Sequence, residues 1–147
     1  MLGTAQPSDS LRPLRVTARL AMPALREAAL ARQFGAHSSD LNAALALSFA
    51  RLGSPCDLST ASFNELSNGG CYVAAPSVDP SVGALTQPGT DHVLSADAAG
   101  VVATLIALNE LTARSETVWT EHYYSLLEFV RSHPERAAIG TAFLHYV

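Results

Sequence analysis

The side chains best able to carry out covalent chemistry in this 147-residue chain are two cysteines and five histidines. Cys71 and His92 are candidates for a nucleophile–base pair, because both fall in a part of the chain expected to form strands and a thiol needs a base within hydrogen-bond reach. Cys56 and Cys71 lack the C-x-x-C spacing of redox and zinc motifs. We expect two reduced, structural thiols, while a disulfide between them stays open.

Motifs of the common enzyme classes are absent from the sequence. It contains no G-x-S-x-G, no H-E-x-x-H and no phosphate-binding glycine-rich loop. The histidines show no metal-ligand spacing, and we interpret them as surface or capping residues. They are His37, His92, His122, His133 and His145. We therefore expect a protein without enzymatic activity, cofactor or metal ion.

Charge is distributed unevenly along the chain, with a formal net charge of −4. Residues 1–54 hold six arginines and three acids, whereas residues 55–147 hold three arginines and ten acids. A nucleic-acid-binding protein would show a basic stripe, so we do not expect direct DNA binding. The acids are also too sparse to imitate the phosphates of DNA. The arginines available to an alternative, nucleic-acid-binding regulator are Arg12, Arg15, Arg19 and Arg26.

Signals for export or membrane insertion are not found. The first fifteen residues have no apolar core of signal-peptide length. The longest apolar run, at 98–108, is shorter than the ~20 residues needed to span a bilayer. We expect a cytoplasmic protein that does not associate with a membrane.

The elements that must position these side chains begin after a polar, proline-containing tail at 1–13, and we expect 14–147 to form a single domain. A β-branched centre predicts a strand over 14–21. Good helix formers after Pro23 predict a helix over 23–34, ended by Gly35.

A second helix is predicted over 38–53, with Ser39 as its N-cap and Gly53 as its stop. Its apolar stripe has helical spacing. The residues of the stripe are Leu41, Leu45, Phe49 and Leu52.

Two hairpins are predicted in the middle of the chain. Asn68-Gly69 suits a tight turn in which both central residues have positive φ. A second extended pair over 82–95 has its turn at 87–90, where proline and glycine are adjacent. We expect an α+β fold, with a small antiparallel sheet of about four strands in two hairpins packed with four to five helices.

Helix signals return after the hairpins. Ser95 predicts an N-cap, and Asp97 suits the positive end of the helix dipole. This helix is apolar almost all round between residues 98 and 108, so we expect it to be buried, and Gly100 suggests close approach of another backbone. A further helix is expected to begin at Ser115, with one face formed by Trp119, Tyr123, Leu126, Leu127 and Val130.

The last predicted helix follows Ser132 and Glu135, which have the spacing of a capping box, with Pro134 in the first turn.

Three of these segments resemble the antirestriction protein family that includes KlcA and ArdB. They are ELSNGGCYVAAP (65–76), LSADAAGVVATLIALNEL (94–111) and LLEFVRSHPERAAI (126–139). Their order and approximate spacing agree with the family, and the resemblance covers about residues 60–145. The chain departs from the family at Cys71, where an aromatic residue is expected, and at 55–64, which keeps only Phe63 among the expected aromatics.

The resemblance implies an antirestriction protein of a mobile element that counteracts host type I restriction of incoming DNA through a non-catalytic protein contact. The implied partner is a host type I restriction–modification component or an accessory host factor, and we expect a monomer. Two alternatives stay open: a thiol-dependent hydrolase using Cys71, and a regulator that binds nucleic acid through the N-terminal arginines.

The candidate partner-contact residues come from the hairpin and from the start of the buried helix. They are Glu65, Ser67, Asn68, Gly69, Gly70, Ser95 and Asp97. We expect them to lie together as an exposed polar patch, although turn and capping duties explain most of them equally well. Glu65 has neither duty.

Overall fold

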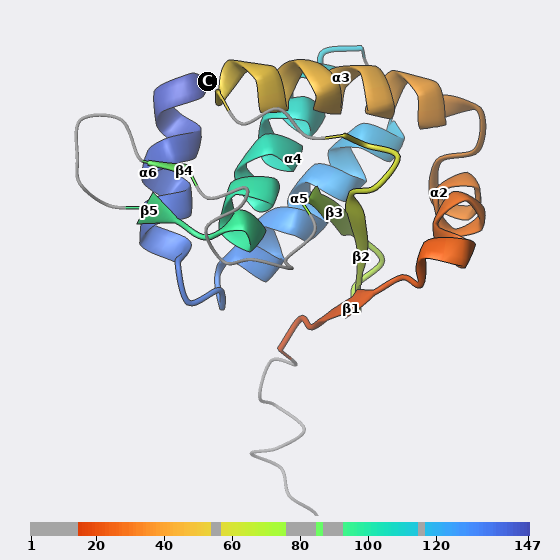
Figure 1. Ribbon diagram of the computed structural model, residues 1–147, viewed down its shortest axis with the longest axis horizontal. Helices are drawn as coiled ribbons and strands as arrows, with labels where there is room; N and C mark the ends of the chain where they lie inside the picture. The colour runs from red at the N-terminus through yellow and green to blue at the C-terminus, as the bar shows by residue number, and fades with distance from the viewer. Residues whose placement is uncertain (1–14, 54–56, 76–84, 87–92, 115–116) are drawn as a thin grey trace, which may run out of the picture.

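A computed structural model describes most of the chain (Figure 1). The described residues are 15–53, 57–75, 85–86, 93–114 and 117–147. The expected tail, the turn at 87–90, Arg12, Cys56, His92 and Ser115 lie outside them.

The strands form two separate antiparallel sheets. β1 (Ala18–Leu20), β2 (Ser62–Leu66) and β3 (Cys71–Ala74) pair in the order β1-β2-β3. β4 (Leu85–Thr86) and β5 (Val93–Leu94) pair only with each other in the described part of the chain. The α+β class and both antiparallel pairs are confirmed, but the prediction of one sheet of about four strands is wrong.

The outer edge of β3 shows why the second pair does not extend the first sheet. The backbone N–H of Val73 donates to Oγ1 of Thr104, on the central helix, at 3.1 Å. A helix side chain therefore occupies the edge on which another strand would have to pair.

The helices include five α-helices in the described residues. They are α2 (Arg26–Phe34), α3 (Ser38–Arg51), α4 (Ala96–Thr112), α5 (Thr117–Val130) and α6 (Arg136–Tyr146), with short 3₁₀ turns η1 (Pro23–Leu25) and η2 (Gly35–His37). The predicted stops at Gly35 and Gly53 are confirmed, since both have positive φ. Ser39 is not the N-cap of α3: the chain enters from η2 with His37 already in a helical conformation, so the N-cap position falls on His37, two residues earlier, without a side-chain cap.

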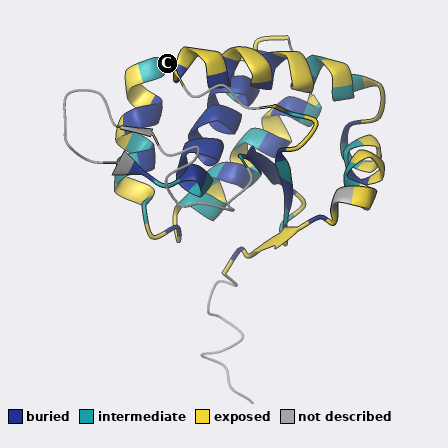
Figure 2. Cartoon of the chain, viewed as in Figure 1, coloured by how far each residue is buried: buried dark blue, intermediate teal, exposed yellow. Residues whose placement is uncertain are grey.

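Helix α4 is the centre of the molecule, and α3, α5, α6 and β3 pack around it (Figure 1). Figure 2 shows α4 buried along its length, whereas α3 exposes its outer side. A Cβ on Gly100 would lie 2.5 Å from the Val73 carbonyl oxygen, which confirms the predicted close approach of a second backbone. The fold therefore surrounds one apolar helix, and Tyr72 of β3 contacts the first turn of that helix at Asp97.

The hairpin between β2 and β3 has a three-residue loop. The N–H of Leu66 donates to the carbonyl of Gly70 at 2.9 Å, and the N–H of Gly69 donates to the carbonyl of Leu66 at 3.0 Å. Gly69 has φ +91°, which suits the left-handed residue that ends such loops. The prediction of a two-residue Asn68-Gly69 turn is therefore wrong by one residue, although the need for glycine at 69 is confirmed.

Candidate functional site

A polar network surrounds the N-terminus of α4. Tyr72 Oη donates to Asp97 Oδ1 at 2.5 Å, and His133 Nε2 lies 2.9 Å from Asp97 Oδ2. The backbone N–H of Glu135 donates to His133 Nδ1 at 3.0 Å. Because Nδ1 accepts, Nε2 must carry the ring proton and donate it to Asp97. Both ring nitrogens are occupied, so His133 orients Asp97 and has no lone pair left for a general base.

Ser95 joins the same network from the other side. Its N–H and hydroxyl donate to the Glu135 carboxylate at 3.0 and 2.5 Å, while its Oγ accepts the N–H of Ala98 at 3.1 Å. The predicted N-cap is therefore confirmed. The predicted capping box is wrong, because Glu135 binds Ser95 and the hydroxyl of Ser132 donates to the Phe129 carbonyl instead.

Ionisation in the network follows from these contacts. Burial raises the pKa of Asp97, but hydrogen bonds from His133 and Tyr72 outweigh it, so the pKa lies below its ordinary value. Burial, together with the hydrogen bond to Asp97 and its charge, raises the pKa of Tyr72. At neutral pH an ionised carboxylate, half-exposed with 48% of its side-chain surface accessible, thus accepts from the Tyr72 hydroxyl and from Nε2 of His133.

Aromatic contacts connect the network to the hairpin. The rings of Tyr72 and Phe129 stack with centroids 5.4 Å apart, and Phe129 meets His133 edge-on at 5.7 Å. Residues from all three sequence segments, 65–76, 94–111 and 126–139, therefore contact one another here. Sequence analysis did not include Tyr72, His133 or Glu135 among the candidate contact residues, although each lies inside one of those segments.

The hairpin loop docks on α5. The Asn68 amide donates to the Ser125 carbonyl at 2.9 Å and to the Glu128 carboxylate at 2.8 Å, and its Oδ1 accepts the N–H of Gly70 at 3.1 Å. Gly70 is buried, and a Cβ there would lie 2.7 Å from that of Ser125. Asn68 and Gly70 thus have structural roles in seating the loop.

Two loop residues are exposed, Ser67 and Gly69. Ser67 also pairs with the start of β1: its N–H donates to the Thr17 carbonyl at 2.8 Å, and its hydroxyl accepts the Thr17 N–H at 3.0 Å. The loop is therefore held between β1 and α5 while its tip faces solvent.

Glu65 faces α2 and is not free. Its carboxylate accepts from Arg32 at 2.5 Å, from Gln33 at 3.3 Å and from Arg19 at 3.5 Å. Glu65 has neither a turn nor a capping duty, but these contacts give it a structural role between the hairpin and α2. The seven candidate residues thus divide into the α4 network with Ser95 and Asp97, the loop on α5, and Glu65 against α2.

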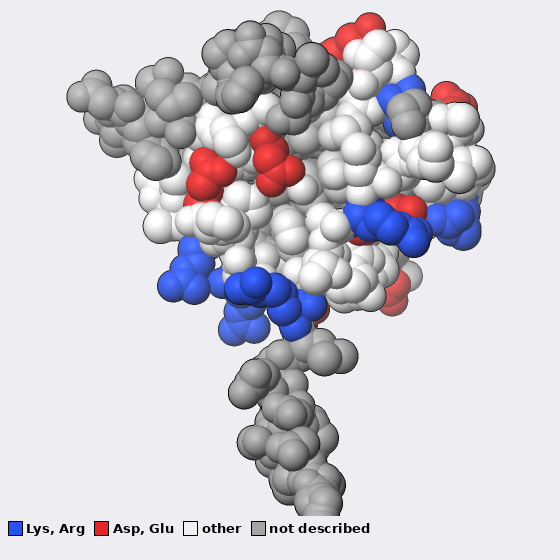
Figure 3. Space-filling view, turned by 60° about the horizontal axis from the view of Figure 1, so that its bottom comes forward, with Lys and Arg blue, Asp and Glu red and all other residues white. Residues whose placement is uncertain are grey.

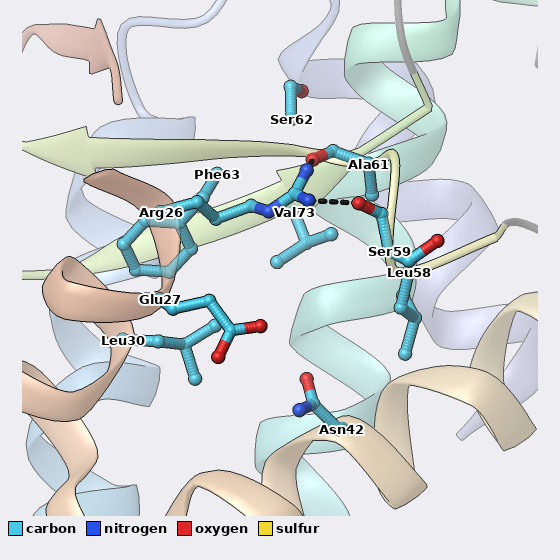
Figure 4. A pocket seen from close by; sticks show the side chains of 10 residues that line it. All are labelled: Arg26, Glu27, Leu30, Asn42, Leu58, Ser59, Ala61, Ser62, Phe63 and Val73. Carbon is cyan, nitrogen blue, oxygen red and sulfur yellow. Dashed lines mark hydrogen bonds between the residues drawn. The ribbon is translucent and has the colours of Figure 1, made fainter. Parts of the chain in front are cut away.

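A hollow of about 300 Å³ lies between α2, α3 and the hairpin (Figure 4). Arg26 crosses it, and its guanidinium donates to the carbonyls of Ser59 and Ala61. Glu27 and Asn42 point into the hollow from the two helices (Figure 4). Arg26, one of the four arginines proposed for nucleic-acid binding, is therefore engaged within the protein.

On the face shown in Figure 3, the basic side chains of the described residues do not form one continuous stripe of the kind expected of a nucleic-acid-binding protein. On the face in Figure 3 the basic side chains form separate groups, with acidic side chains and uncharged surface between them.

Cys71 is a free, buried thiol, so it forms no disulfide with Cys56. Burial raises the pKa of Cys71, with a smaller contribution from the charge of Glu65, so the thiolate is disfavoured at neutral pH. Its proposed base, His92, lies outside the described residues. In the described part of the chain no group of His, Cys, Asp and Glu side chains could hold a metal ion, and no helix there is long and apolar enough to cross a membrane.

This chain is similar to known proteins both in sequence and in three-dimensional structure. The sequence model of the antirestriction protein family matches residues 59–143. The antirestriction protein KlcA of Escherichia coli is 42% identical over 86 residues, covering 54% of this chain and 58% of KlcA. The uncharacterized protein YafX of Escherichia coli K12 is 38% identical over 81 residues, covering 53% of each chain. This chain thus spans a little over half the length of these curated relatives.

The solved structure of the KlcA and ArdB proteins extends the likeness to nearly the whole chain. It superposes with a TM-score of 0.72 at 31% identity, covering 97% of this chain and 99% of that one. Those proteins show a novel fold and antirestriction activity against type I DNA restriction systems in vivo but not in vitro.

Proposed function

Because this chain belongs to the antirestriction protein family, we propose that it counteracts host restriction of incoming DNA, chiefly by type I systems. The observation that carries the proposal is the match over 97% of the chain to the KlcA and ArdB fold, whose members show that activity in vivo. We propose further that the gene is carried on a mobile element. Residues 14–147 would then act as a single domain, in the cytoplasm and as a monomer.

The mode of action that fits the site is a non-catalytic contact with a restriction–modification component or an accessory host factor. In the α4 network, His133 has both nitrogens engaged, and Asp97 accepts two hydrogen bonds that hold it in place. Such an arrangement presents a fixed, half-exposed negative charge, which suits recognition better than proton transfer. Of the seven candidate residues, Asp97, Ser67 and Gly69 are the most accessible, and we place the contact on them.

Two observations oppose the alternative functions. The Cys71 thiol is buried and its pKa is raised, which is the opposite of what a nucleophilic cysteine needs. Arg26 donates to the carbonyls of Ser59 and Ala61, so it would have to give up internal partners before it bound phosphate, and the charge of Arg19 is offset by Glu65.

Plasmid transfer into restricting and non-restricting hosts tests the proposal. Expression of the chain should raise the transfer of unmodified plasmid into the restricting host and leave transfer into the non-restricting host unchanged. Plasmid that already carries the host modification provides the control for general effects on uptake. Equal transfer of unmodified plasmid with and without the chain, at normal abundance of the protein, would sink the proposal.

A further inference from the structure

Three large apolar side chains are exposed next to one another where β1 leads into α2. Leu20, Met22 and Leu25 are 60%, 66% and 57% exposed. They line one groove of about 400 Å³ between β1 and α2, together with Ala28 and Ala29. Single exposed apolar residues are ordinary, whereas a contiguous group of them marks an interaction surface.

The backbone of β1 is open along the same groove. β1 pairs with β2 on one side, and no described strand lies on its other side. The carbonyl of Thr17 and the N–H of Ala21 bond to the β2 hairpin, so the alternation of an antiparallel ladder directs the N–H and C=O groups of Ala18 and Leu20 away from the sheet. An edge of this kind is a template for an added strand.

Positive charge lies beside the open edge. Arg19 and Arg32 are 82% and 64% exposed at their side chains and share one carboxylate, that of Glu65. The three groups carry a net charge of +1, and each guanidinium has further N–H donors beyond those used on Glu65. The site is therefore complementary to a ligand that brings a carboxylate.

Antiparallel pairing with a second copy of the chain is disfavoured at this edge. The antiparallel register that uses both outward-facing residues of β1 would place Arg19 directly opposite Arg19 of the other copy. Like charges at directly opposite positions destabilise a strand pair. The occupant must instead offer an acidic side chain at that position.

We propose that the β1 edge and its groove bind an extended segment of the restriction-system partner by strand addition. This segment carries an acidic side chain that meets Arg19 and Arg32 and apolar side chains that cover Leu20, Met22 and Leu25. The identity of the partner as a restriction-system protein rests on the proposed function; the chemistry of the segment rests on the groove alone.

The binding test uses purified full-length protein and a short synthetic peptide of alternating glutamate and leucine residues. Titration followed by amide NMR should shift the signals of Ala18 and Leu20 and slow their hydrogen exchange. A peptide with lysine in place of glutamate should not bind. Absence of binding by the glutamate peptide, shifts confined to other elements, or shifts at β1 produced by duplex DNA but not by the peptide would each overturn the inference.

Two variants sharpen the test. Ala18→Pro removes an outward N–H without removing a bond between β1 and β2, so binding should weaken about tenfold or more while the fold is kept. Arg19→Ala should weaken binding of the glutamate peptide by a similar factor. Matched controls are Arg131→Ala and Leu144→Ala, which alter an exposed arginine and an exposed leucine away from β1 and should bind normally. Unchanged binding by Ala18→Pro would exclude strand addition.

The same variants separate this inference from the proposed function. If the unmodified chain raises plasmid transfer and both Ala18→Pro and Arg19→Ala do so equally well at equal abundance, the docking inference fails and the antirestriction proposal stands. If the unmodified chain does not raise transfer, the antirestriction proposal fails. The peptide titration then still tests whether the groove at β1 binds an extended segment with acidic and apolar side chains.

Discussion

Replacing Asp97 tests whether the network around α4 stabilises the fold beyond an ordinary charge at a helix terminus. A carboxylate in the first turn of a helix contributes about 0.3–1 kcal/mol through the helix dipole. Asp97 also accepts hydrogen bonds from Tyr72 and from the buried His133. Removal of the side chain therefore leaves two donors without a partner.

The magnitude follows from these two donors. A buried donor left unpaired costs about 1–3 kcal/mol, and the half-exposed position of Asp97 lets water compensate for part of this. We expect Asp97→Ala to lower the free energy of unfolding by about 2–4 kcal/mol. Asp97→Asn should cost about 1–2 kcal/mol. The asparagine amide can accept a hydrogen bond from His133 and donate one to a rotated Tyr72 hydroxyl, so both hydrogen bonds are kept and only the added strength that the negative charge gives them is lost.

Urea denaturation at neutral pH measures these costs, with Asp40 as the matched control. Asp40 also lies in the first turn of a helix, α3, but its ion-pair partner is the exposed Arg114 at 3.6 Å. Asp40→Ala and Asp40→Asn should each cost about 1 kcal/mol or less.

The pH dependence has a definite sign. The pKa of Asp97 is lowered in the folded state, so the unfolded state binds the proton more readily. The stabilisation is complete above the ordinary aspartate pKa of about 3.9 and is lost as the pH falls through the lower, folded value. The difference in the free energy of unfolding between the unmodified chain and Asp97→Asn should therefore be constant near neutral pH and should disappear in acid. Equal costs for Asp97→Ala and Asp40→Ala, or a gap that widens in acid, would refute this reasoning.

Three further predictions concern the scaffold that holds the site. Gly100→Ala should destabilise by about 1–3 kcal/mol or more, because its Cβ would meet the Val73 carbonyl at 2.5 Å, and thermal unfolding should show a lower Tm; an unchanged Tm would mean that α4 and β3 are not in close contact. Leu105→Ala should cost about 2–5 kcal/mol in chemical denaturation, since Leu105 is fully buried in α4, and a loss under ~0.5 kcal/mol would place that side chain at the surface. Gly69→Val should cost about 1–3 kcal/mol through its positive φ alone, because its Cβ would meet no neighbouring atom, so a variant as stable as the unmodified chain would contradict the loop conformation.

Tyr72→Phe separates stability from recognition at the network. It removes one hydrogen bond to Asp97 without changing the surface charge. If Asp97→Asn lowers protection of incoming plasmid and Tyr72→Phe of similar stability does not, the charge itself contacts the partner. If both variants protect incoming plasmid as well as the unmodified chain does, at equal abundance, the network has a structural role only.

Features that depend on neighbours within a helical turn or a tight loop were predictable from the sequence. Ser95 caps α4, Gly35 ends α2 and Gly69 takes the left-handed position of the hairpin loop, because a cap or turn is decided by a few adjacent residues. The nearly continuous apolar run of α4 likewise indicated a buried helix, since such a helix has no polar side to present to water.

The assembly of the site was decided by the tertiary structure alone. Tyr72 meets Asp97 across 25 positions and His133 meets it across 36, and Glu135 leaves its expected capping role to bind Ser95 across 40. Local preferences do not reach so far along the chain: these partners are chosen when α4, β3 and the α5–α6 connection pack together, and a polar group buried by that packing takes the nearest donor or acceptor that remains. The same packing engages Glu65 and places Thr104 against the edge of β3, which keeps the second strand pair out of the sheet.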